Sequence, residues 1–281
     1  MREVLFSGEN SLIAQSRHAA EQAAPVNGDG FGVGFYLPDV HPEPAVFVST
    51  SPAWNNRNIH YNATRVRSGC LFAHVRAASH GEVAEMNCHP FRHGRLLMMH
   101  NGNVGDFRAI KRRLRRGLSD EAYHWVKGQT DSEHLFAVFV DRLREAADEL
   151  TPRSLADALL STIARLRELG EQCGVVEPSL LNLAVTDGQS IVATRYVSHP
   201  SLAPPSLYYA APGLLPGGGE GEPRSEVAGD PAGAIIASEK LGGDAKQWHA
   251  VPRNHLVSID RELRASIETI DDRAACGGSR S

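Results

Sequence analysis

Two amphipathic helices occupy the middle of the chain, and each carries clear signals for where it begins. The segment Thr130-Asp131-Ser132-Glu133 fits a capping box, in which Thr130 caps the helix and the Glu133 side chain reaches back to the Thr130 backbone. The second helix has Thr151 as N-cap and Pro152 at its first position, where proline loses no hydrogen bond. Apolar residues recur at helical spacing, at Leu135, Val138, Phe139 and Leu143 and again at Leu155, Leu159, Ile163 and Leu166. One face of each helix is therefore predicted to be buried.

Short strands flank these helices on both sides. Apolar runs separated by Gly, Pro and Asn precede them, at residues 33–36, 45–50, 70–76 and 95–100. After the helices, residues 181–186 and 189–194 predict a hairpin, because Asp187-Gly188 tolerates the positive φ angles of a two-residue turn. Further strands are predicted at 207–210, 234–238 and 256–259. This order predicts an α+β fold.

The outer parts of the chain complete this organisation. Residues 10–24 predict a further amphipathic helix. The composition shows no break or linker, so we expect a single domain over residues 1–272 rather than two. Residues 211–233 are rich in Gly and Pro and predict a mobile loop, and 273–281 predict a disordered tail.

Composition excludes several functional classes. With a net charge of -4 and neither a zinc finger nor an aromatic RNA-binding motif, the chain is not expected to have nucleic acid as a partner. No apolar run reaches the length of about 18 residues that a membrane helix needs, so we expect no membrane partner and a cytoplasmic location. The four cysteines lack the spacing of a disulfide framework or zinc site. The basic run Lys111-Arg112-Arg113-Leu114-Arg115-Arg116 predicts a short solvated helix.

Four segments carry the functional signal, although each has a simple structural explanation alone. The glycine-rich stretch at 27–34 precedes a strand and lacks the Lys-Ser/Thr of a phosphate loop. Arg76 ends an apolar strand and could pair with a surface carboxylate. Asn101-Gly102 could form a hairpin turn, and Asp131 suits the first turn of any helix.

In this order, the segments resemble the class II (N-terminal nucleophile) glutamine amidotransferase family. The resemblance is closest to stand-alone, amidohydrolase-like members related to enzymes of ergothioneine synthesis and glutathione degradation. It covers roughly residues 10–260 and rests on "NSLIAQS", "NGDGFGVGFY", "FAHVRAAS", "HPF", "HNGNV", "TDSE" and "ASEKL". It implies a four-layer αββα sandwich of the N-terminal nucleophile hydrolase type, with no cofactor and no metal.

The resemblance also implies a reaction and a set of roles. A cysteine at the mature N-terminus would attack the side-chain amide of glutamine or a γ-glutamyl compound, with its own α-amino group as the base. Arg76 would bind the substrate's α-carboxylate through two parallel donors, and Asp131 would bind the α-ammonium. The Asn101 side-chain amide and the Gly102 backbone N–H would form the oxyanion hole. The substrate site would also include His100, Asn27, Gly28 and Asp29.

The start of the sequence departs from the family pattern, which begins Met-Cys, whereas this chain begins Met1-Arg2. We therefore expect a first strand and its cysteine to be missing from the sequence as written. Three interpretations are open. In the first, which we favour because Arg76, Asn101, Gly102 and Asp131 are all intact, the translation start lies further upstream. In the second, the short form is a pseudoenzyme. In the third, another nucleophile acts.

An internal cysteine is not expected to replace the nucleophile. Cys70 begins an apolar strand, where a thiol is usually an inert small hydrophobe. Cys88 neighbours His89, but residues adjacent along a strand face opposite sides. The sequence thus predicts an amidohydrolase acting on glutamine or a γ-glutamyl compound, with possible ammonia transfer to a synthase partner in trans. The alternative is a catalytically inactive γ-glutamyl-binding protein. The oligomeric state is left open.

Overall fold

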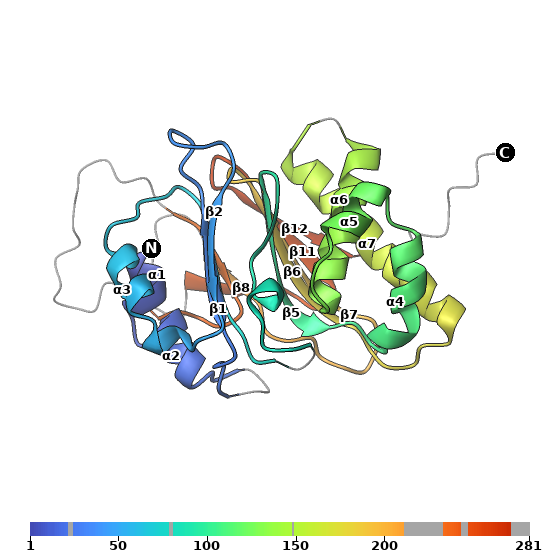
Figure 1. Ribbon diagram of the computed structural model, residues 1–281, viewed down its shortest axis with the longest axis horizontal. Coiled ribbons are helices and arrows are strands. Elements are labelled where there is room, and N and C mark those ends of the chain that lie inside the picture. Colours follow the sequence, from blue (N-terminus) through green and yellow to red (C-terminus); the bar gives the residue numbers. More distant parts are fainter. Residues whose placement is uncertain (22–24, 79–80, 148, 211–232, 243–246, 271–281) are drawn as a thin grey trace.

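The secondary structure is arranged in four layers. The computed structural model describes residues 1–21, 25–78, 81–147, 149–210, 233–242 and 247–270. Figure 1 shows, from left to right, a group of N-terminal helices, a first β layer, a second β layer and a second group of helices. This is the predicted αββα order. The predicted tail at 273–281 and all but the last residue of the predicted loop at 211–233 lie outside the described residues.

The first helical layer contains three short helices and a 3-10 turn, namely α1 (Arg2–Phe6), α2 (Leu12–Arg17), η1 (Ala53–Asn55) and α3 (Arg57–Ala63). The predicted helix over 10–24 is thus much shorter than expected. Ser11 caps its start by accepting a hydrogen bond from Ala14 N. Beyond Arg17, the backbone amides of Ala20 and Glu21 donate to the Glu239 carboxylate instead of to helical carbonyls. A partner distant in the sequence therefore ends the helix.

The first β layer consists of two three-stranded antiparallel sheets. One has the order β2 (Ala45–Ser49), β1 (Phe31–Phe35), β3 (Leu71–Val75), and the other has the order β10 (Trp248–Ala250), β8 (Tyr208–Ala210), β9 (Ile235–Ala237). Glycines let the layers approach closely, because a Cβ at Gly34 would lie 2.7 Å from the side chain of Leu97 in the opposite layer. The strands predicted in this region from short apolar runs are confirmed within one or two residues at their ends.

The second β layer is a six-stranded antiparallel sheet. Its order is β12 (Ala265–Thr269), β11 (His255–Ile259), β7 (Ile191–Val197), β6 (Leu180–Thr186), β5 (Leu96–Asn103), β4 (Phe91–His93). Strands β6 and β7 form the predicted hairpin, but the predicted two-residue turn is wrong. Thr186 pairs with Ile191, which leaves a four-residue connection at 187–190. The Asp187 carboxylate accepts hydrogen bonds from Gln189 N (2.9 Å) and Ser190 N (2.7 Å), which stabilises the longer turn.

Four helices cover the outer face of the six-stranded sheet: α4 (Phe107–Arg116), α5 (Asp120–Trp125), α6 (Asp131–Ala146) and α7 (Pro152–Cys173). The predicted N-caps Thr130 and Thr151 are both confirmed. The capping box at Thr130 is only half formed. Thr130 accepts from Glu133 N, but the Glu133 carboxylate binds the amides of Lys127 and Gly128 rather than the Thr130 backbone. The basic run lies on α4, as predicted.

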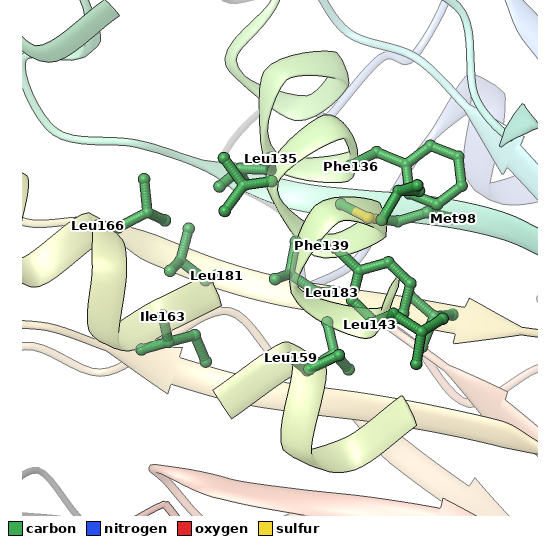
Figure 2. Close-up of a cluster of buried hydrophobic side chains, with 14 of the residues drawn as sticks. Met98, Leu135, Phe136, Phe139, Leu143, Leu159, Ile163, Leu166, Leu181 and Leu183 are labelled. Carbon is green, nitrogen blue, oxygen red and sulfur yellow. The ribbon is translucent and has the colours of Figure 1, made fainter. Parts of the chain in front are cut away.

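The largest hydrophobic core lies between these helices and the sheet. Figure 2 shows leucine and phenylalanine side chains of α6 and α7 meeting Met98, Leu181 and Leu183 from β5 and β6. Both predicted apolar stripes are buried, and Leu135, Phe139, Leu155 and Leu159 have no exposed surface. None of the helices in the described ranges combines the length and the apolar character needed to cross a membrane.

Candidate active site

The end of β5 provides the first part of the candidate site. His100, Asn101 and Gly102 lie within this strand and pair with Leu183, Asn182 and Leu181 of β6. Asn101-Gly102 is therefore not a hairpin turn. Gly102 has φ +144°, and a Cβ on it would lie 1.9 Å from the carbonyl oxygen of Leu180. Only glycine fits this position, because a side chain would be excluded both by the backbone conformation and by the neighbouring strand.

His100 connects this strand to the start of α6. Its Nε2 lies 3.1 Å from the carbonyl oxygen of Leu180, and its Nδ1 lies 3.0 Å from the Ser132 hydroxyl. A carbonyl oxygen can only accept, so Nε2 donates to Leu180. The imidazole is buried. His100 is therefore fixed at both ring nitrogens, and its contacts orient the strand rather than leave a ring nitrogen open to a ligand.

Asp131 is the first residue of α6, and its carboxylate is held in place by backbone amides. Oδ1 accepts from Ser132 N and Oδ2 accepts from Val104 N, each at 2.8 Å. Val104 directly follows β5, so this carboxylate links the start of α6 to the strand that carries Gly102. The side chain is 8% exposed. A buried, oriented carboxylate of this kind can receive a cation.

Arg76 follows β3 and is 5% exposed. Its backbone is bound to the glycine-rich loop, since Arg76 N donates to Gly30 O and Asp29 N donates to Arg76 O, both at 2.9 Å. The Asp29 carboxylate also accepts from Ala78 N at 2.8 Å. The guanidinium Nη1 donates to the carbonyl oxygen of Glu82 at 3.4 Å. Asp29 therefore supports the segment that carries Arg76.

The other two predicted residues of this loop lie against α2 and Trp54. Asn27 donates through its backbone N to Ser16 O at 2.9 Å and through Nδ2 to Gln15 O at 3.5 Å, so it contacts α2. A Cβ on Gly28 would lie 3.0 Å from the Trp54 ring. Their contacts anchor the loop.

Buried histidines surround Arg76 and His100. The rings of His74 and His89 lie 4.3 Å apart, centroid to centroid. Burial lowers the pKa of His74 to about 4. A hydrogen bond with the His100 backbone opposes this shift, and electrostatic interactions with His100 and Arg76 add to it. Burial likewise holds the pKa of His89 well below its usual value, with smaller contributions from His74, His100 and Arg76. Both rings are therefore neutral at pH 7.

The two buried thiols are poor nucleophiles. Burial raises the pKa of the Cys70 thiol to about 11. Burial also raises the pKa of the Cys88 thiol, which contacts the carbonyl oxygens of Ser49 and Ala84 at 3.6 Å. Neither ring nitrogen of His89 has a hydrogen-bond partner among the described residues, so His89 does not serve Cys88 as a base. Both thiols are therefore protonated at neutral pH, which agrees with the sequence-based expectation.

Sequence reasoning missed several buried polar residues around these positions. Asn87 bridges the segments that lead away from Arg76 and toward Asp131. Ser132 orients His100, and Asn182 pairs with Asn101 across the strands. The only signal for Asn87 was its place two residues before the "HPF" motif. Within the described part of the chain, no cluster of three or more His, Cys, Asp or Glu side chains could hold a metal ion.

The layer order is that of the four-layer αββα sandwich of N-terminal nucleophile hydrolases. Solved structures of glutamine amidotransferases share this fold. The family model for class II glutamine amidotransferases matches residues 11–210. The chain belongs to this family.

Individual relatives agree with this assignment. The probable glutamine amidotransferase DUG3 of Saccharomyces cerevisiae is 36% identical over 97% of this chain and 81% of its own length. The gamma-glutamyl-hercynylcysteine sulfoxide hydrolase of Mycobacterium tuberculosis is 28% identical over 84% of this chain and 77% of its own length. The structure of a glutamine aminotransferase class-II domain protein from Silicibacter pomeroyi has a TM-score of 0.65 and 30% identity, covering 86% of this chain and 92% of that protein.

Proposed function

We propose that this protein binds the γ-glutamyl group and hydrolyses its side-chain amide, in glutamine or in a γ-glutamyl compound. The observation that carries the proposal is the hydrogen bond from Val104 N to the Asp131 carboxylate at 2.8 Å, which joins the start of α6 to the residue that follows β5. Two relatives support the substrate class by name, one as an amidotransferase and one as a γ-glutamyl hydrolase.

Each residue has a distinct role in this proposal. Arg76 binds the α-carboxylate, a task that suits the planar guanidinium with its parallel donors. Asp131 binds the α-ammonium while backbone amides fix the orientation of its carboxylate. Asn101 and Gly102 donate to the oxyanion that forms when the amide carbon is attacked, where loss of one donor costs about 10² to 10³ in rate. Asn27, Gly28 and Asp29 position the segment of Arg76, and His100 positions the strand of the oxyanion hole.

Attack on the amide carbon requires a nucleophile. Family resemblance assigns it to a cysteine at the mature N-terminus, and the raised pKa values of Cys70 and Cys88 argue against either thiol in that role. The attacking sulfur would form an acyl-enzyme with the γ-carbonyl as the C–N bond breaks, and the amine would leave with a proton. Water would then release glutamate. The proposal also includes possible ammonia transfer to a synthase in trans. It further includes action in the cytoplasm, where the free thiols of Cys70, Cys88 and Cys173 would persist.

Calorimetry tests the binding part of the proposal. Arg76→Ala removes the carboxylate contact and should weaken glutamine binding by about 2 kcal/mol or more, which is a rise in Kd of roughly 30-fold. Arg112→Ala, on the exposed face of α4, is the matched control and should bind glutamine like the wild type. Undiminished binding by Arg76→Ala would show that the substrate lies elsewhere.

The second candidate function is γ-glutamyl binding without turnover, which the protonated state of the two buried thiols favours. Intact mass spectrometry and N-terminal sequencing of the protein from its native cells, with a glutaminase assay on the same sample, separate the two. An exposed N-terminal cysteine together with ammonia release supports hydrolysis. Binding of glutamine without ammonia release supports the alternative.

A further inference from the structure

Asn87 lies between the two segments that carry the proposed substrate contacts. It ends the short 3-10 turn η2 (Glu85–Asn87) and is 1% exposed. Its Nδ2 donates to the carbonyl oxygen of Glu82 at 2.9 Å, and its Oδ1 accepts from the backbone N of Gln129 at 3.2 Å. One buried amide therefore joins the loop after β3 to the segment before α6.

On the first side, the carbonyl oxygen of Glu82 is shared by two donors. It accepts from Asn87 Nδ2 and also from Arg76 Nη1 at 3.4 Å. Asn87 thus fixes the position of a backbone oxygen that in turn contacts the guanidinium. A shift of this carbonyl oxygen would change its contact with the Arg76 guanidinium.

On the other side, Gln129 is two residues before Asp131. The preceding amides of Lys127 and Gly128 donate to the Glu133 carboxylate at 2.8 and 2.7 Å. Gly128 lies between two side chains, since a Cβ on it would be 2.6 Å from Asn87 Oδ1 and 2.9 Å from Glu133 Oε2. Asn87 and Glu133 together therefore hold the segment that enters α6, and this packing leaves no room for a side chain at position 128.

We propose that Asn87 is a positioning residue that sets the distance between Arg76 and Asp131. The inference rests on the proposed function, in which these two residues bind the α-carboxylate and the α-ammonium of one substrate. A ligand with both charged groups requires both partners at a fixed separation, whereas a ligand with one group does not. Asn87 contacts neither group and acts through Glu82 on one side and Gln129 on the other.

The isosteric variant Asn87→Asp tests this role, because a carboxylate cannot donate to the Glu82 carbonyl. Calorimetry should show a rise in the Kd for glutamine of about 10-fold or more, as is typical when a supporting contact is removed. Binding of two one-sided analogues is measured in parallel by ligand-detected NMR. These are 4-aminobutanamide, which lacks the carboxylate, and 4-carbamoylbutanoate, which lacks the amine. Their affinities should change less than about 3-fold, because neither spans the two partners.

The matched control is Asp141→Asn, also on α6 but at its far end. Asp141 accepts from Ser119 N (2.8 Å) and Ser119 Oγ (2.6 Å), so it too joins a loop to this helix. This variant should unfold more easily and bind glutamine normally. Gly128→Ala is a second test should Asn87→Asp fail to fold, because its Cβ displaces the Asn87 amide without removing it.

The outcomes separate the two proposals. If the wild type binds glutamine and the Asn87→Asp and Gly128→Ala variants bind it equally well, the positioning role is refuted and the proposed function stands. Equal weakening for glutamine and both one-sided analogues would also refute it, because it would show a general structural effect. If the wild type binds neither glutamine nor a γ-glutamyl peptide, the proposed function fails and the role of Asn87 fails with it.

Discussion

Acid should destabilise this protein through His134, a buried histidine in the first turn of α6. Its side chain has no exposed surface, its Nδ1 donates to the Thr130 carbonyl at 2.7 Å, and its Nε2 has no hydrogen-bond partner among the described residues. Burial is the largest cause that lowers the pKa of His134 from 6.5 to about 4. Between these two values the unfolded chain binds a proton that the native protein does not, so the free energy of unfolding falls as the pH falls.

The size of the effect follows from the shift. Each pH unit within the window contributes about 1.4 kcal/mol, so His134 should account for a loss of about 2 kcal/mol between pH 7.5 and pH 5 and about 3 kcal/mol below pH 4. Urea unfolding followed by circular dichroism at pH 7.5 and pH 5 measures this loss. In His134→Gln the loss between the two pH values should be smaller than in the wild type by about 2 kcal/mol.

His124→Gln is the control, because the His124 side chain is exposed. The measurement compares pH-dependent differences within each variant, so a general loss of stability in His134→Gln does not enter. If His134→Gln and the wild type lose the same free energy between pH 7.5 and pH 5, the imidazole titrates normally in the native state and the reasoning from burial is wrong.

Two further predictions concern close packing. Gly102→Ala should greatly lower the melting temperature or abolish glutamine binding, because its Cβ would lie 1.9 Å from Leu180 O. The control is Gly94→Ala, where φ is +53° and no atom lies within 4 Å. This variant should reduce the free energy of unfolding by only about 1–2 kcal/mol. Leu159→Ala should reduce the free energy of unfolding by about 2–5 kcal/mol in urea titrations, while Ser161→Ala on the exposed face of α7 should change it by less than about 0.5 kcal/mol. Similar effects for the two glycines, or for the two α7 residues, would contradict these accounts.

Local signals predicted much of the fold correctly. The caps at Thr130 and Thr151 depend on a side chain and an amide three residues away, so sequence alone located the starts of α6 and α7. Short apolar runs separated by Gly, Pro and Asn located the main strands of both β layers, and helical spacing identified the buried faces of α6 and α7. Short elements without a strong pattern, such as α1 and α3, were not predicted, because packing against the sheet stabilises them more than their own sequence does.

Interactions between distant residues account for the differences. The helix predicted over 10–24 ends at Arg17 because Glu239, about 220 residues away, takes the amides that a longer helix would use. Glu133 suited a capping box by spacing, yet its carboxylate binds the Lys127 and Gly128 amides in the folded chain. The Asp187-Gly188 turn gained two residues because the Asp187 side chain bonds to the amides that follow.

In the candidate site, too, some features follow from the sequence and others only from the tertiary structure. The sequence by itself determined which residues could bind a γ-glutamyl group, since Arg76, Asn101, Gly102 and Asp131 stand in recognisable motifs, and their roles remain predictions. Only the tertiary structure decided that the Asp131 carboxylate binds the amide after β5 and that Asn87 bridges to the loop of Arg76. A motif records the chemistry of neighbours in the chain. The partner of a buried polar group is set by whichever strand or loop the fold brings within hydrogen-bond distance.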